Sequence, residues 1–275
     1  MDYSLSLVLG VIQGLTEFLP VSSSGHLVLF QHLFGLKEPE LLFDIWLHAG
    51  TLAAVGVVFF NEIQKIVSAL VRLPALIKEA GGVKPLFAEN EEIRIVVFIL
   101  IGSIPTAVLG LFIESKADRI FGTPWVSGLM LLVTGTFLWF TKKITRKERS
   151  IKQLTIKDAL IIGFVQGVAV LPGISRSGAT ISAALFLGME RGSAGSFSFL
   201  LSIPAILGAL LLSLNSPLTQ GSVSEKMIFL GAFTAAVVGF FALKALLRAV
   251  KGGRLHYFAP YCWAVGAIAL AIMAF

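Results

Sequence analysis

Two polar segments interrupt apolar stretches of this chain, and they share residues in register. Residues 13–25 read QGLTEFLPVSSSG and residues 166–178 read QGVAVLPGISRSG, so Gln, Gly, Ser, Ser and Gly recur at a constant offset of 153. Pro and Gly break a helix, and serine hydroxyls supply hydrogen bonds at the start of the next one. In a membrane, such a break is tolerated only where protein or a water-filled cavity satisfies the freed backbone groups. The two segments therefore predict one functional site.

The residues around these breaks suit an anion. The predicted donors are Ser22, Ser23, Ser24 and Gly25 in the first copy and Ser175, Ser177, Gly178 and Thr180 in the second. Anions favour helix N-termini, where backbone N–H groups are free. The second copy adds Arg176, whose guanidinium can bind phosphate through two parallel hydrogen bonds. A pocket built from both breaks is expected to take phosphate or diphosphate.

The differences between the two copies predict chemistry. Glu17 and His26 of the first copy correspond to Val170 and Ala179 of the second, so only the first copy carries groups that transfer protons. Gln13 lies one helical turn before Glu17, on the same face. We expect carboxylate, hydroxyl and imidazole to converge there. A hydroxyl nucleophile, an acid or base and an arginine together suggest phosphoryl transfer.

Structural roles are the alternative for each of these residues. A serine in an apolar helix often returns its hydroxyl to a backbone carbonyl. Glu17 and Arg176 could form a buried ion pair with each other, and His26 could serve in packing. His48 lies four residues after Asp44, on one helix face near the expected opening of the first segment. A supporting role at the site is predicted for His48.

The composition is that of a membrane protein. Hydrophobic residues make up 56% of the chain and charged residues 14%, whereas a typical soluble domain has about 25% charged residues. The mean hydropathy is +0.88. Since about 20 apolar residues cross a bilayer, the predicted crossings are 44–60, 93–113, 125–141, 196–214, 227–247 and 257–275.

The basic residues predict the orientation of these crossings. Connections 61–94, 141–157 and 248–254 hold 15 Lys and Arg residues, and the alternate connections hold 4. Basic residues favour the cytoplasmic side, so the first set is expected there. This asymmetry accounts for most of the net charge of +6 without any nucleic-acid partner.

The two polar segments lie outside the six crossings, within 4–34 and 157–190. Each is long enough for two short helices and a break, the form of a re-entrant hairpin. The prediction is an all-α polytopic membrane protein with a single membrane domain, 1–275. It consists of two inverted-topology repeats, 1–142 and 157–275, each with one re-entrant helical hairpin and three transmembrane helices. Such repeats place a site near their pseudo-twofold axis.

EFLPVSSSGH at 17–26 and PGISRSGAT at 172–180 resemble the two signature motifs of the bacterial undecaprenyl-diphosphate phosphatases, the integral membrane family linked to bacitracin resistance. The resemblance implies hydrolysis of undecaprenyl diphosphate to undecaprenyl phosphate, which recycles the lipid carrier for peptidoglycan and envelope polymers. It also implies the bacterial inner membrane, with the site opening to the external or periplasmic side. Bacitracin would act on the same substrate.

The resemblance also implies roles for individual residues. Ser23 corresponds to the proposed nucleophile, His26 to the family's histidine and Arg176 to its essential arginine. The phosphate-contacting hydroxyls fall on Ser175, Ser177 and Thr180. Some family members have two carboxylates in the first motif, whereas this chain has Gln13 and Glu17. Family members are reported to need a divalent cation, so we expect Mg²⁺ or Ca²⁺ to bind with the diphosphate and with Glu17.

The sequence is also compatible with another function and with another nucleophile. A transporter that flips a polyprenyl phosphate would use the same anion site, although a carrier needs no nucleophile. Water activated by Glu17 could attack in place of Ser23. Gln13 and His48 complete the predicted substrate-binding set. A homodimer is an assembly that the sequence leaves open.

Overall fold

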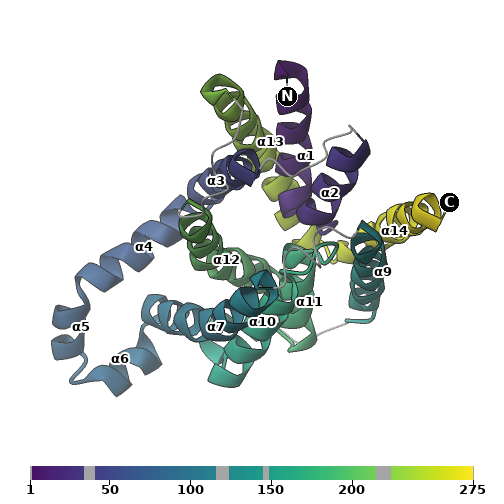
Figure 1. The fold of residues 1–275 in the computed structure, drawn as a ribbon. Helices are drawn as coiled ribbons and strands as arrows, with labels where there is room; N and C mark the ends of the chain where they lie inside the picture. The colour runs from purple at the N-terminus through teal and green to yellow at the C-terminus, as the bar shows by residue number, and fades with distance from the viewer. Residues whose placement is uncertain (1, 34–40, 116–123, 145–148, 215–223, 275) are drawn as a thin grey trace.

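The computed structural model describes residues 2–33, 41–115, 124–144, 149–214 and 224–274 (Figure 1). These residues form thirteen α-helices joined by turns, three 3₁₀ segments and one isolated bridge between Arg149 and Met189. The all-α prediction is confirmed.

Five helices are long and apolar enough to cross a membrane. They are α7 (Glu91–Glu114), α9 (Pro124–Phe140), α12 (Arg191–Leu214), α13 (Glu225–Lys251) and α14 (Ala259–Ala274). The helices α9 and α14 reach this length together with an adjoining 3₁₀ turn, as the spans Trp125–Lys143 and Leu255–Met273. A sixth candidate is α3 (Leu41–Val58), which forms with α4 (Phe60–Val71) a pair bent by 80°. Each predicted crossing coincides with one of these helices. The chain is a multi-pass membrane protein.

The two polar segments fold as pairs of short helices, as predicted. The first pair is α1 (Tyr3–Phe18) and α2 (Ser23–Leu33), and the second is α10 (Ile156–Val168) and α11 (Arg176–Phe186). None reaches the roughly 20 residues that a crossing requires. The helices α1 and α10 end shortly before Pro20 and Pro172, because proline lacks the N–H that would continue the helix.

Matched glycines seat the first helix of each pair against a long helix. The helix α1 packs along α13, and α10 packs along α7. A Cβ added to Gly10 would lie 2.7 Å from the carbonyl oxygen of Gly231. At the same offset of 153, a Cβ on Gly163 would overlap the backbone of Gly102. Only glycine permits backbones to approach this closely.

The connection 61–94 is helical in addition to being basic. It contains α4, α5 (Leu73–Glu79) and α6 (Val83–Glu89), which extend away from the other helices in Figure 1. The helix α4 carries Gln64, Lys65 and Ser68 on one face and exposes Val67 and Val71 on the other. It is amphipathic, whereas the crossings are apolar all round.

Arg149 anchors the start of the second pair of short helices, α10 and α11. Its guanidinium donates to the carboxylate of Asp158 at 2.7 Å and to the carbonyl oxygens of Gln153 and Leu187 at 2.6 and 2.9 Å. Asp158 and Thr155 form a reciprocal capping box at the N-terminus of α10. Arg149 is one of the basic residues of the connection 141–157 that predicted the orientation, and the structure adds this local role.

We expect Gly163→Ala to lower the thermal unfolding midpoint in detergent, because its methyl group has no room against Gly102. Gly208→Ala is the control, since a Cβ at Gly208 would meet no atom within 4 Å. Alanine also has the higher helix propensity, so the control should retain or raise the midpoint. Equal midpoints for the two variants would contradict the packing of α10 on α7.

Candidate active site

The first helix break, residues 19–22 between α1 and α2, faces the second break, residues 169–175 between α10 and α11. A Cβ on Gly25 would lie 3.1 Å from Cα of Gly173, and one on Gly178 would lie 3.0 Å from Cβ of Pro20. These contacts are reciprocal, because Gly25 and Gly178 correspond at the offset of 153, as do Pro20 and Gly173. The N–H of Gly173 donates to the Ser22 hydroxyl at 3.1 Å. The two breaks meet, as predicted, and the anion pocket expected from their union stays a prediction.

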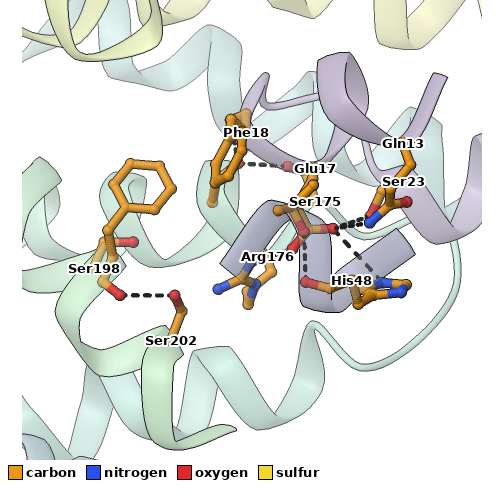
Figure 2. Close-up of polar contacts among 12 residues, drawn as sticks. Gln13, Glu17, Phe18, Ser23, His48, Ser175, Arg176, Ser198 and Ser202 are labelled. Carbon is orange, nitrogen blue, oxygen red and sulfur yellow. Dashed lines mark hydrogen bonds and ion pairs between the residues drawn. The ribbon is translucent and has the colours of Figure 1, made fainter. Parts of the chain in front are cut away.

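Glu17 lies at the centre of the polar contacts, with 5% of its side chain exposed. Its Oε2 accepts hydrogen bonds from Ser23 Oγ at 2.6 Å and from Gln13 Nε2 at 3.1 Å. Its Oε1 forms an ion pair with Arg176, and His48 Nε2 lies 3.7 Å from Oε2. Figure 2 shows Ser23, His48 and Arg176 directed toward this carboxylate. Four helices, α1, α2, α3 and α11, supply the cluster.

The local backbone explains how these side chains meet. Gln13 and Glu17 are one turn apart on α1, so their side chains lie on one face. Ser23 and Arg176 are the first residues of α2 and α11, directly after the two breaks. Among the described residues, Ser22 is the one non-glycine residue with a positive φ, 70°. This left-handed conformation is unfavourable for serine and turns the chain sharply before Ser23.

The predicted convergence of His26 with the carboxylate and hydroxyl is wrong for this structure. His26 Nδ1 lies 2.8 Å from the carbonyl oxygen of Ser22, and Nε2 lies 2.8 Å from the hydroxyl of Tyr261. The ring turns back to the carbonyl of the residue just before its own helix and outward to α14. His48, predicted in a supporting role, is the histidine that approaches Glu17.

Several predicted phosphate contacts are buried and already bonded. Ser175 Oγ accepts from the N–H of Gly178 at 3.1 Å, and Ser177 Oγ donates to the carbonyl of Phe18 at 2.9 Å. Thr180 Oγ1 donates to the carbonyl of Arg176 at 2.8 Å. Ser177 and Ser22 bond across the two breaks, whereas Ser175 and Thr180 bond within the second segment. Contact of these hydroxyls with phosphate stays a prediction. The partly exposed members of the predicted set are Ser23, Ser24, His48 and Arg176.

Sequence reasoning missed Tyr261 and Ser198. Tyr261 is 235 positions from His26, and Ser198 shares a short hydrogen bond with Thr180 across α11 and α12. Neither residue lies in a polar break. No local signal in the sequence distinguishes them from the packing residues around them.

The oxygens around Glu17 limit how a metal could bind. Gln13 Oε1 is buried and has no hydrogen-bond partner in the structure. No group of three or more His, Cys, Asp or Glu side chains suited to a metal occurs among the described residues. One carboxylate and one amide oxygen do not form a cage. They fit the usual Mg²⁺ arrangement, in which substrate phosphates provide further ligands.

The arrangement can support nucleophilic substitution at phosphorus. The Ser23 hydroxyl donates to a carboxylate, which is how a weak nucleophile is activated by an adjacent base. Arg176, with 18% of its side chain exposed, lies on the other side of the same carboxylate and can stabilise an anion there.

We expect Arg176→Met to lower the thermal unfolding midpoint strongly, because it leaves Glu17 buried without its main counter-ion. Breaking a buried pair in this way typically costs about 3–5 kcal/mol. The double variant Glu17→Gln/Arg176→Met should recover much of that loss. Tryptophan fluorescence during heating in detergent measures the unfolding midpoints of the parent protein and of the two variants.

Arg72→Met is the matched control, since Arg72 and Glu79 are 65% and 62% exposed and 3.9 Å apart. Its midpoint should stay close to that of the parent protein, because exposed pairs contribute little. A double variant no more stable than Arg176→Met would contradict the coupling of Glu17 and Arg176.

Comparison with known proteins identifies the family. The family model described as bacitracin resistance protein BacA matches residues 6–268. Among similar proteins, the undecaprenyl-diphosphatase of Desulforapulum autotrophicum is 50% identical over 270 residues, which cover 98% of each chain. That of Desulfosudis oleivorans is 49% identical over 273 residues, 99% of each chain. That of Methanobrevibacter smithii is 38% identical over 270 residues, 98% of this chain and 96% of its own. The chain therefore belongs to the family of the bacitracin resistance protein BacA.

Proposed function

We propose that this protein hydrolyses undecaprenyl diphosphate to undecaprenyl phosphate and inorganic phosphate. The observation that carries the proposal is the hydrogen bond from Ser23 to the buried Glu17 beside Arg176. The relatives named undecaprenyl-diphosphatase, which match almost the full length, support the same reaction. They favour the enzyme over a carrier of polyprenyl phosphate.

In the proposed mechanism, the diphosphate binds beside Ser23 and competes with Glu17 for Arg176. Glu17 is then free to accept the proton of the Ser23 hydroxyl as Oγ attacks the terminal phosphorus. The bond between that phosphorus and the bridging oxygen breaks, and undecaprenyl phosphate leaves. Glu17 passes its proton to the departing oxygen of undecaprenyl phosphate and becomes a carboxylate again. Water then attacks the phosphoserine while Glu17 accepts a proton from it. Glu17 returns this proton to Ser23 Oγ as the bond from Oγ to phosphorus breaks, and inorganic phosphate is released.

A divalent cation, Mg²⁺ or Ca²⁺, is proposed to bind mainly through the diphosphate. Glu17 and the free amide oxygen of Gln13 are the protein groups that would hold it. When bound, it would neutralise negative charge on the phosphates. The small number of protein ligands supports binding that depends on the substrate.

We also propose that the two halves, 1–142 and 157–275, are inverted repeats, each with one re-entrant hairpin and three crossings. The matched packing of α1 on α13 and α10 on α7 supports this arrangement, as do the reciprocal contacts of the breaks. The distribution of basic residues supports a bacterial inner-membrane orientation with the site open to the outside. Bacitracin would compete for the same lipid there.

Ser23→Ala tests the nucleophile. We expect phosphate release from undecaprenyl diphosphate in detergent to fall by about 10³-fold or more, because the attacking oxygen is lost. Ser103→Ala is the control, since the Ser103 hydroxyl donates to the carbonyl of Ile99 within α7. Only mild impairment of Ser23→Ala would instead support direct attack by water, and no release by the parent protein would contradict the phosphatase.

Removal of divalent cations should separate activity from stability. We expect EDTA to abolish phosphate release and to leave the unfolding midpoint of the substrate-free protein unchanged, because the protein supplies too few ligands of its own. Added Mg²⁺ or Ca²⁺ should restore the rate. A large drop in the midpoint with EDTA would contradict a substrate-associated cation.

A further inference from the structure

The imidazole of His26 is almost fully enclosed, with 2% of the residue exposed. Its Nδ1 faces the carbonyl oxygen of Ser22 at 2.8 Å. A carbonyl only accepts hydrogen bonds, so Nδ1 must carry a proton. Its Nε2 faces the hydroxyl of Tyr261 at 2.8 Å, and the two rings lie nearly parallel, 7° apart, with centroids separated by 5.7 Å.

The surroundings of His26 favour the neutral ring. None of the five ion pairs found among the described residues includes His26. A buried imidazolium without a counter-ion is costly. With Nδ1 protonated and the ring neutral, Nε2 is an acceptor and the Tyr261 hydroxyl donates to it.

The neutral ring of His26 is hydrogen-bonded to Ser22, the residue of the first break that has a positive φ. The Ser22 carbonyl accepts from both Nδ1 and the backbone N–H of His26, the latter at 3.2 Å. The Ser22 hydroxyl accepts from the N–H of Gly173 across the interface. Because Ser22 has a positive φ, it needs such contacts to keep its conformation. Ser23, directly after it, then points its hydroxyl to Glu17.

The helix α14 contacts the first break at two adjacent residues. Besides the bond from Tyr261, the thiol of Cys262 lies 3.5 Å from the carbonyl oxygen of Pro20. On the other side, α9 contacts the second break, where Thr134 Oγ1 donates to the carbonyl of Gly173 at 2.9 Å. The helices α9 and α14 pack together, so this pair contacts both breaks, α14 the first and α9 the second.

We propose that Tyr261 is a positioning residue for the phosphatase reaction. It fixes His26 as the neutral Nδ1–H tautomer, and His26 holds Ser22 so that Ser23 meets Glu17. In this role His26 acts through the backbone and transfers no proton. The proposal rests on the phosphatase function proposed above, and it assigns the proton transfer at Ser23 to Glu17.

The test uses two amides that imitate different ring nitrogens. In His26→Asn the amide nitrogen takes the place of Nδ1 and can still donate to Ser22, whereas in His26→Gln it reaches the place of Nε2. We expect His26→Asn to keep kcat within about tenfold of the parent protein, the effect of one lost hydrogen bond. His26→Ala and His26→Gln should lose about 100-fold or more, because the Ser22 carbonyl loses its side-chain partner and keeps only the backbone N–H of residue 26.

Tyr261→Phe keeps the ring and removes the hydroxyl. We expect kcat to fall by about tenfold with little change in KM, and no further fall when the substitution is added to His26→Asn, which has no Nε2. Tyr257→Phe is the control, because Tyr257 is 67% exposed and contacts the ring of His256. It should retain the parent activity.

The outcomes separate this proposal from the phosphatase itself. If the parent protein releases phosphate but folded His26→Asn is as inactive as His26→Ala, His26 transfers protons and the positioning role is wrong. Full activity of Tyr261→Phe would also overturn the role of Tyr261. If the parent protein releases no phosphate, the proposed phosphatase function is wrong. Thermal unfolding midpoints then still test the contact between His26 and the Ser22 carbonyl, since His26→Asn should be more stable than His26→Ala.

Discussion

The ion pair between Glu17 and Arg176 is the interaction on which the site depends. It joins α1 to α11 across 159 positions of sequence, and the Glu17 carboxylate is almost wholly buried. Two charges removed from water are stable only when their remaining hydrogen bonds are also satisfied. Ser23, Gln13 and His48 provide those contacts, so the groups proposed for catalysis are also the groups that stabilise the buried carboxylate.

The ion pair forms only because the two breaks approach closely. Glycine at positions 25 and 178 allows the backbones to meet, and Gly10 and Gly163 seat the supporting helices on their partners. A side chain at Gly10 or Gly163 would separate the helices, and one at Gly25 or Gly178 would require the facing residue to shift. Since the distance between Arg176 and Glu17 depends on this approach, small residues far from the carboxylate control its geometry.

The glutamine that the two segments share, Gln13 in the first and Gln166 in the second, makes different hydrogen bonds in each. Gln13 donates to Glu17, whereas Gln166 donates to the hydroxyl of Thr106 and the carbonyl of Leu201, each at 3.3 Å. The second copy has Val170 where a carboxylate would be needed. One copy therefore supplies the carboxylate and serine, and the other supplies the arginine and structural hydrogen bonds.

The sequence alone determined the helical class, the apolar crossings and the two broken segments, because hydropathy and helix-breaking residues are local patterns. The repeat also predicted that the two breaks build one site, but the ion pair between Glu17 and Arg176 was only one alternative at that point. The sequence predicted the wrong place for the His26 ring and missed Tyr261. Only the tertiary structure decided these points, together with the approach of His48 and the burial of Ser175, Ser177 and Thr180. The direction of a side chain depends on the hydrogen-bond partners that neighbouring helices bring to it, and those helices are distant in sequence.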